Sequence, residues 1–172
     1  TSIPGMTPPV EDGSTFAEAA LGHAAMYDGL EILLMRVVEP GTATTAAAEY
    51  LRIRAHQLGL GGLKTRTLVH QGVPLQEILQ VAEREKVSMI FLTSKGEGFS
   101  ASLGRLAKDL CRTALCPTLL VKAGMAPRAP ERILLPVDGS SRGEKAVAAA
   151  LTLPGPHIKQ ATLLMVGDLP VA

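Results

Sequence analysis

The stretch VSMIFLTSKGEGFSASLG, residues 87–104, decides the fold of this chain. Its first half, SMIFLTS (88–94), is apolar without alternation, which predicts a strand buried on both faces of a sheet. Its second half, TSKGEGFSASLG (93–104), holds a lysine, three serines and three glycines. A glycine-rich segment with a cation directly after a buried strand is typical of a phosphate-binding loop. The stretch therefore predicts either such a loop or the remnant of one.

Helical patterns alternate with short apolar runs on both sides of this stretch. The clearest helix is PLQEILQVAEREK (74–86), where Leu75, Ile78, Leu79 and Ala82 repeat with helical spacing. Further strands are predicted at EILLMRVV (31–38), KTRTLVH (64–70) and CPTLLVK (116–122), and further helices at 43–58 and 102–114. Strands that are separated by helices pair in parallel, so the sequence predicts an α/β fold.

Composition excludes several classes of protein. The chain has 172 residues, is 47% hydrophobic and carries a net charge of +1, which favours a globular protein and gives no case for a nucleic-acid partner. No apolar run approaches the roughly 20 residues of a membrane-spanning helix. The N-terminal TSIPGMTPPVEDGS lacks the pattern of a signal peptide.

The cysteines and histidines show no metal-ligand spacing. Cys111 and Cys116 are the two cysteines, and they predict reduced thiols in a cytoplasmic protein rather than a disulfide framework. The four histidines are scattered along the chain, so surface or hydrogen-bonded histidines are the expectation and no metal site is predicted. Motifs of serine hydrolases, P-loops and dinucleotide-binding turns are also missing from the sequence.

An internal repeat organises the rest of the chain. DGSTFAEAALGHAA (12–25) and DGSSRGEKAVAAAL (138–151) match at a constant offset of 126 residues. Each copy contains a capping-box pattern, Thr15 with Glu18 and Ser141 with Glu144, which predicts a turn that enters a helix.

The segments that precede the two copies differ. ILLPV (133–137) is a good strand, whereas TPPVE (7–11) contains adjacent prolines, which cannot belong to a hydrogen-bonded central strand. We therefore expect the first copy to have a damaged or missing opening strand.

Three segments follow from this organisation: a domain at 1–122, a linker at 123–131 and a partial second copy at 132–172. The last segment, a β-α-β unit that ends in ATLLMV (161–166), is too small to be stable alone and must pack on something. It could pack on a partner chain. Alternatively, ILLPV could fill the central position that TPPVE cannot occupy, within the chain or by exchange between chains.

Together these features resemble the universal stress protein family. The matching motifs are VEDGS (10–14), LLMRVVEP (33–40), GVPLQEIL (72–79), MIFLTSKG (89–96), LGRLAKDLCRTALCPTLLV (103–121) and VDGSS (137–141). The resemblance implies a flavodoxin-like or Rossmann-like doubly wound sheet of five parallel strands in the order 3-2-1-4-5. It also implies that domains pair through the last strand, here 116–122, and that the chain is similar to a tandem protein with a truncated second half.

The opening stretch departs from the family's ATP-binding pattern. Members that bind ATP carry Gly-x-x-Gly, nine residues, then Gly followed by Ser or Thr. Here Thr93 replaces the first glycine, only seven residues separate Gly96 from Gly104, and Arg105 replaces the hydroxyl residue. The side chain of Thr93 crowds an approach that glycine permits. The residues that the resemblance makes candidates for phosphate contact are Thr93, Ser94, Lys95, Gly96, Gly104 and Arg105.

Three further residues match positions near the base and ribose of the nucleotide. Asp12 and Asp138 match the family's aspartate, and Val37 matches a residue whose backbone meets the adenine. The alternative for both aspartates is a turn residue before a helix, and for the loop it is a solvated connection from strand to helix.

The resulting functional hypothesis is a non-enzymatic, cytoplasmic stress-response protein. It would form homodimers through the strand at 116–122 or by exchange of 132–172, and it would sense ATP or another adenine nucleotide. One alternative is a ligand-free interaction or scaffold module. A slow ATPase is a third, less favoured because Glu97 is the only carboxylate near the phosphate loop in sequence.

Overall fold

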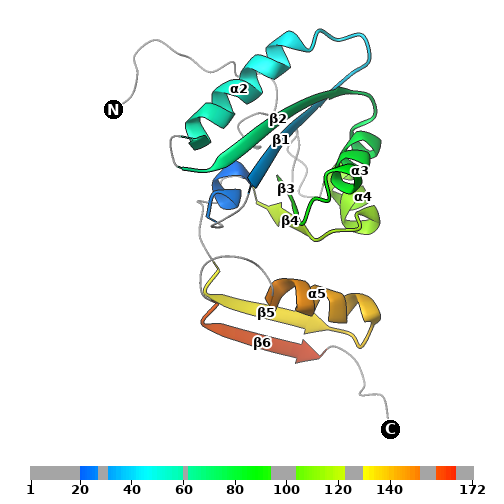
Figure 1. The fold of residues 1–172 in the computed structure, drawn as a ribbon. Coiled ribbons are helices and arrows are strands. Elements are labelled where there is room, and N and C mark those ends of the chain that lie inside the picture. The colour runs from blue at the N-terminus through cyan, green and yellow to red at the C-terminus, as the bar shows by residue number, and fades with distance from the viewer. Residues whose placement is uncertain are drawn as a thin grey trace.

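The computed structural model of the chain describes residues 20–26, 31–59, 62–93, 104–122, 130–151 and 158–165. Residues 20–24 are helical. The elements that follow are β1 (Glu31–Val38), α2 (Thr45–Gly59), β2 (Lys64–Gln71), α3 (Pro74–Arg84), β3 (Ile90–Thr93), α4 (Arg105–Thr113), β4 (Thr118–Val121), β5 (Arg132–Val137), α5 (Ser141–Leu151) and β6 (Gln160–Met165). Figure 1 shows their arrangement.

The described strands pair in parallel, two by two along the chain. The described strands form three two-stranded sheets, β1 with β2, β3 with β4, and β5 with β6. Parallel pairing of strands that are separated by helices confirms the predicted α/β class. The five-strand order stays a prediction, because the segment expected to open the central strand, 7–11, lies outside the described residues.

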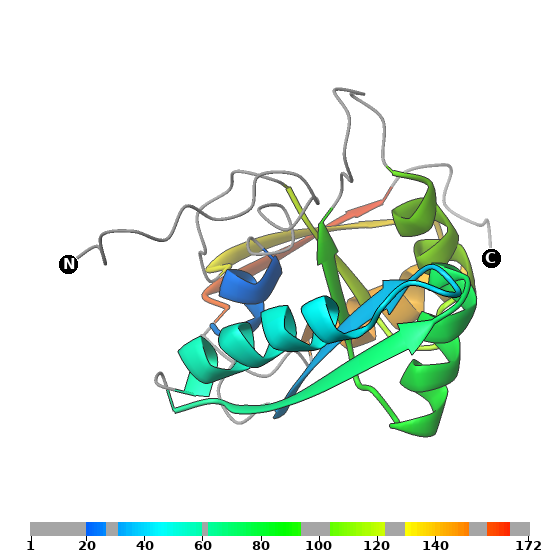
Figure 2. The ribbon, with the colours of Figure 1, turned by 90° about the horizontal axis from the view of Figure 1, so that it is seen from above.

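Helices cover both faces of the β1–β2 pair. Because parallel neighbours in register point to the same face, Ile32 and Thr65 share one face, and Thr65 donates a hydrogen bond from Oγ1 to the carbonyl of Ala55 in α2 at 3.2 Å. Figure 2 shows α2 lying along these strands. Leu33 and Arg66 share the opposite face, where Arg66 bonds Glu85 beside α3. The pair is therefore the centre of a three-layer arrangement.

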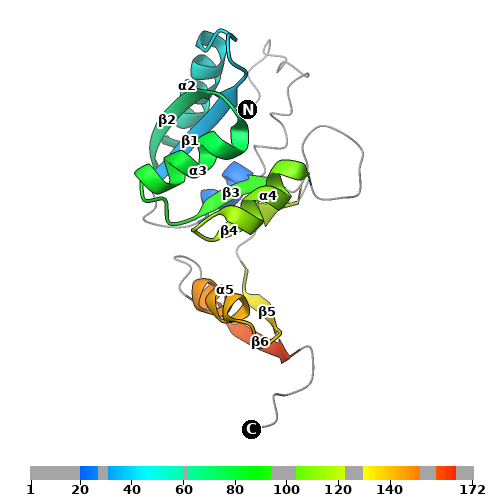
Figure 3. The same cartoon turned by 90° about the vertical axis from the view of Figure 1, so that its right-hand side faces the viewer.

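Helices α3 and α4 pack side by side (Figure 3), and they carry the best-buried side chains of this region. Leu110 has no exposed surface, and Val81 and Ala107 are nearly as well buried. The apolar stripe predicted in α3 is partly buried. The best-buried residue of the helix is Val81, which does not belong to that stripe. The four residues of β3 are only partly buried, so the prediction that this strand is buried on both faces is wrong.

A ring contact ties α2 to β1. The guanidinium carbon of Arg36 in β1 lies 5.5 Å from the ring centre of Tyr50 in α2, and that of Arg54 lies 5.3 Å from the same ring. Both distances lie within the range of a cation–π interaction. Both arginines therefore contact the ring of Tyr50 where the helix meets the strand.

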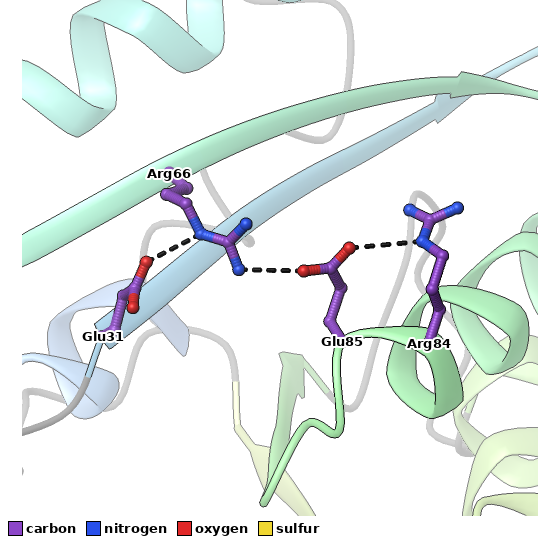
Figure 4. Close-up of polar contacts among 4 residues, drawn as sticks. All are labelled: Glu31, Arg66, Arg84 and Glu85. Atoms are coloured by element: carbon purple, nitrogen blue, oxygen red, sulfur yellow. Dashed lines mark hydrogen bonds and ion pairs between the residues drawn. The ribbon is translucent and has the colours of Figure 1, made fainter.

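Ion pairs connect the amino-terminal end of the β1–β2 pair to the end of α3 (Figure 4). Arg66 bonds Glu31 at 2.7 Å and Glu85 at 3.0 Å, and Arg84 bonds the other oxygen of Glu85 at 3.2 Å. Hydrogen bonds from Arg66, and then from Arg84, lower the pKa of the Glu85 carboxyl group. The network fixes the end of α3 against the strands, although exposed ion pairs of this kind contribute little individually.

A separate β-α-β unit, defined here as β5, α5 and β6, follows the first four strands (Figures 1 and 3). In this chain β5 pairs with β6, from Arg132 opposite Gln160 to Val137 opposite Met165. The hypothesis that 133–137 fills a position in the first sheet of its own chain is therefore wrong. Whether the unit is a copy of the first domain stays a prediction.

The start of α5 differs by one residue from the predicted capping box. Ser140, not Ser141, is the capping residue, because its Oγ accepts a hydrogen bond from the amide of Gly143 at 3.1 Å. The sequence pattern placed the cap at the second of two adjacent serines. The corresponding box at Thr15 and Glu18 lies outside the described residues.

Candidate functional site

The carboxyl ends of the first strands carry the described part of the predicted site. Val37 is the penultimate residue of β1 and lies opposite His70 of β2 in the parallel register. The amide of Gly72 donates to the carbonyl of Val38 at 3.1 Å, which keeps the two strand ends together. Carboxyl ends of parallel strands are where ligands bind in open α/β sheets, so Val37 lies at the expected edge.

His70 and Glu77 form a contact that the sequence analysis missed. Nδ1 of His70 lies 2.7 Å from a carboxylate oxygen of Glu77, in the first turn of α3, and both side chains are mostly buried. A Cβ built on Gly72 would lie 2.7 Å from the other oxygen of Glu77, so glycine makes room for the carboxylate. Periodicity could not reveal this pair, although a histidine at a strand end followed by a carboxylate in the next helix's first turn is a usable signal.

The phosphate side of the predicted site is described at its two ends. Thr93 ends β3, and Gly104 is the residue before α4. Gly104 makes no side-chain capping bond, so the first amides of α4 receive no side-chain acceptor from the capping position. Arg105 is the first residue of α4, and 97% of its side chain is exposed. Its Nε lies 3.8 Å from Oδ2 of Asp109 in the same helix.

Asp138 lies in a different sheet from these residues, directly after β5. Its Oδ1 accepts a hydrogen bond from the amide of Ser140 at 2.9 Å. Hydrogen bonding by Ser140 lowers the pKa of the Asp138 carboxyl group. The structure therefore shows Asp138 as a turn residue before a capped helix, which is the structural alternative that the sequence left open.

Four of the predicted site residues lie outside the described residues: Asp12, Ser94, Lys95 and Gly96. The structure thus places Val37, Thr93, Gly104 and Arg105 at strand ends or at a helix start. Val37 belongs to the β1–β2 sheet, Thr93 to the β3–β4 sheet, and Asp138 follows a strand of the third sheet.

Three further features of the described residues concern reactive thiols, metal-binding groups and membrane-spanning helices. Cys111 and Cys116 are both free thiols, and partial burial raises the pKa of Cys116. Within the described ranges, no three histidine, cysteine or carboxylate side chains are grouped so as to hold a metal ion. None of the described helices has the length and apolarity that a membrane span needs.

Comparisons with known proteins agree with the arrangement. The sequence pattern of the universal stress protein family matches residues 9–122. Universal stress protein MJ0531 of Methanocaldococcus jannaschii is 36% identical over 63 residues, which are 36% of this chain and 37% of that protein. The match thus spans little more than a third of that relative. A universal stress protein of Thermus aquaticus, described by its position in the 3′ region of a QAH/OAS sulfhydrylase, is 29% identical over 134 residues, covering 64% of this chain and 93% of that one.

Solved structures show the same fold. The protein MJ0577 superimposes with a TM-score of 0.60 at 23% identity, covering 69% of this chain and 94% of its own. The universal stress protein UspA of Lactobacillus plantarum superimposes with a TM-score of 0.54 at 16% identity, covering 60% and 88%. These likenesses extend the α/β Rossmann-like assignment beyond the strand pairs described above. The family pattern covers most of the chain and the fold agrees with it, so the chain belongs to the universal stress protein family.

Proposed function

We propose that this protein is a non-enzymatic, cytoplasmic member of the stress-response family that dimerises and senses an adenine nucleotide. The observation that carries the nucleotide part is the start of α4. Gly104 leaves the first amides of the helix without a side-chain acceptor, and the exposed guanidinium of Arg105 lies at the same point. Together, helix amides and a guanidinium suit an anionic group such as a phosphate.

The base would lie toward the ends of β1 and β2. Val37 matches the family position whose backbone meets adenine, and its register partner is His70. The contact between Glu77 and Nδ1 fixes the orientation of the histidine ring. In this proposal His70 at the end of β2 lies on the base side of the nucleotide, and the start of α4 lies on the phosphate side.

Thermal denaturation with and without millimolar ATP and magnesium tests the nucleotide part. A ligand that binds only the folded protein raises the free energy of unfolding by about 2.7 kcal/mol at a hundredfold excess over Kd. Replacing Arg105 with alanine should weaken nucleotide affinity about tenfold, since it removes a charge-assisted contact. Arg112→Ala is the matched control, because Arg112 is a second exposed arginine in the last turn of α4.

Either of two results would contradict this part. Unchanged melting at saturating nucleotide would favour the ligand-free interaction module. Equal loss of affinity in Arg105→Ala and Arg112→Ala would mean that the helix start is not the phosphate site. Measurable phosphate release from ATP would overturn the non-enzymatic assignment.

The interaction module is a second candidate because of the β-α-β unit at 132–165. Asp138 is engaged in its own turn rather than in a ligand site, and several large apolar side chains of this unit are exposed.

The proposed dimer is tested by the molecular mass in sedimentation velocity, and a monomer mass at every concentration would overturn it. The edge of β4, within 116–122, and exchange of 132–172 are the two routes that the sequence suggests. The two free thiols support the cytoplasmic location.

A further inference from the structure

The imidazole ring of His70, at the end of β2, is held at one nitrogen and open at the other. Nδ1 lies 2.7 Å from Oε2 of Glu77, and both side chains are mostly buried. Nε2 makes no hydrogen bond with a described residue, yet it is not one of the fully buried polar atoms that lack a partner. This nitrogen is therefore accessible from outside, on a ring whose orientation is fixed.

Glu77 also determines which nitrogen carries the hydrogen in the neutral ring. An ionised carboxylate only accepts hydrogen bonds, so we assign the hydrogen to Nδ1, which donates it to Glu77. Nε2 is then the unprotonated nitrogen and accepts a hydrogen bond. The outward directions of the two nitrogens diverge widely in a five-membered ring, so Nε2 is directed away from Glu77. The pair thus provides a fixed acceptor.

The place of this acceptor in the sheet favours a ligand as its partner. His70 and Val37 are the penultimate residues of two parallel strands and lie opposite each other in the register. The carboxyl ends of parallel strands form the edge at which open α/β sheets bind ligands. A mostly buried acceptor that finds no partner within the protein costs free energy, unless water or a ligand donates to it.

The turn after β2 is shaped around the carboxylate. The backbone of Gly72 has a φ of +150°, and a Cβ there would lie 2.7 Å from Oε1 of Glu77. Helix α3 begins at Pro74, so Glu77 lies in its first turn and reaches back toward the strand end. A glycine at 72 therefore permits the contact that fixes the ring of His70.

We infer that Nε2 of His70 accepts a hydrogen bond from the exocyclic amine of adenine, which makes His70 a residue that determines base specificity. This inference rests on the proposed nucleotide site and names what that site selects. Adenine carries a donor, the amine, where guanine carries an acceptor, the carbonyl oxygen. Two acceptors cannot share a hydrogen bond, so guanine in the same position would leave Nε2 unpaired. A site that hydrogen-bonds one group rejects an analogue that lacks it for this reason.

The hydrogen bond is tested by the affinities of the full chain for ATP and for purine riboside triphosphate, which lacks only the amine. Titration calorimetry should show that the wild type binds ATP about fivefold more tightly, as expected for one neutral hydrogen bond. His70→Phe keeps a ring and removes the acceptor, so this preference should vanish. The ratio of the two affinities separates the contact from any general loss of affinity.

The matched control for this variant is His56→Phe. His56 is an exposed histidine in the last turn of α2, so its replacement should leave the preference for ATP as in the wild type. Circular dichroism checks that each variant is folded.

Glu77→Gln tests the role of the carboxylate and leaves the histidine in place. A glutamine amide can donate to Nδ1 as well as accept from it, so the hydrogen of the neutral ring can move to Nε2. The preference for ATP over purine riboside triphosphate should then fall below that of the wild type. Glu83→Gln is the matched control, because Glu83 is an exposed glutamate of the same helix, and it should keep the preference.

The outcomes separate the inference from the proposed function. Nucleotide binding with a preference that His70→Phe or Glu77→Gln leaves unchanged would overturn the inference and leave the nucleotide site intact. Equal binding of the two triphosphates by the wild type would have the same meaning. A wild-type chain that binds neither triphosphate would overturn both the inference and the nucleotide part of the proposed function. If His70→Phe does not fold, Glu77→Gln decides.

Discussion

The β1–α2–β2 unit and the β5–α5–β6 unit have the same plan and a different degree of burial. In both, a helix connects two neighbouring parallel strands. The 15-residue helix α2 contacts both of its strands, whereas the 11-residue helix α5 packs mainly on β5. The first unit also has α3 on its other face, and the second unit has no described element there. A β-α-β unit thus becomes a core only when both faces of its sheet are covered.

Shortening a core leucine in the first region should have the largest effect on the free energy of unfolding. Leu110→Ala should lower the free energy of unfolding by about 2–5 kcal/mol, because Leu110 is fully buried and its removal leaves a cavity. Leu134→Ala in β5 should have a far smaller effect, since that side chain is 60% exposed. Urea denaturation followed by circular dichroism measures both. Equal losses would show that the face of β5 is covered in solution.

A turn glycine in each region gives the next effect. Gly72→Ala should destabilise the protein by about 1–3 kcal/mol, because φ is +150° there and the new Cβ would displace Glu77 from His70. Gly139, with φ of +77°, has no atom within 4 Å of such a Cβ, so Gly139→Ala carries only the backbone strain. Denaturation midpoints of the two variants compare the contributions. A smaller destabilisation by Gly72→Ala than by Gly139→Ala would mean that Glu77 can move away without a loss of stability.

The capping serine of α5 gives a smaller, local effect. Ser140→Ala should destabilise α5 by about 1 kcal/mol, because the amide of Gly143 loses its acceptor. Ser141→Ala is the matched control, since Ser141 is the neighbouring serine that the sequence pattern favoured. Exchange of the α5 amides measures the difference. Faster exchange in Ser141→Ala than in Ser140→Ala would restore the capping box that the sequence predicts.

The smallest expected effect is on how the free energy of unfolding depends on pH. Because hydrogen bonds from Arg66 and Arg84 lower the pKa of Glu85, its ionised form stabilises the fold above its unfolded pKa, and this stability is lost as the pH falls through the lower folded value. The stability difference between wild type and Glu85→Gln should therefore shrink on acidification. Glu131→Gln, which removes the isolated pair with Lys159 at 3.0 Å, is the control in the second region. A difference for Glu85→Gln that does not vary with pH would contradict the assignment.

Local patterns in the sequence were sufficient to predict the elements. The strand at 31–38 was predicted at its observed bounds, and the α3 helix nearly so, because apolar periodicity and proline placement act within one element. The cap at Ser140 was missed by one residue, because two adjacent serines both satisfy the local pattern. The burial of β3 was overestimated, because apolar composition does not show which elements cover a strand.

The candidate site was predictable only where it depends on strand ends. Val37 is the penultimate residue of β1 and Thr93 is the last of β3, each within one residue of the strand end that the sequence predicts. The contact between His70 and Glu77 depends on how β2 and α3 pack, and no spacing rule for metal or catalytic residues includes it. Likewise, Asp138 matches the family motif but accepts a hydrogen bond from the amide of Ser140 in its own turn, which the motif does not show.

The contact of Tyr50 with Arg36 and Arg54 has a consequence for experiments. The chain contains no tryptophan and two tyrosines, so fluorescence excited in the tyrosine band comes from Tyr27 and Tyr50. Two guanidinium groups lie over the ring of Tyr50, at the contact between α2 and β1. Its emission therefore reports on whether that helix is docked on its strand. A Tyr27→Phe chain would carry Tyr50 as its single tyrosine, at the contact between α2 and β1 and distant in sequence from β6.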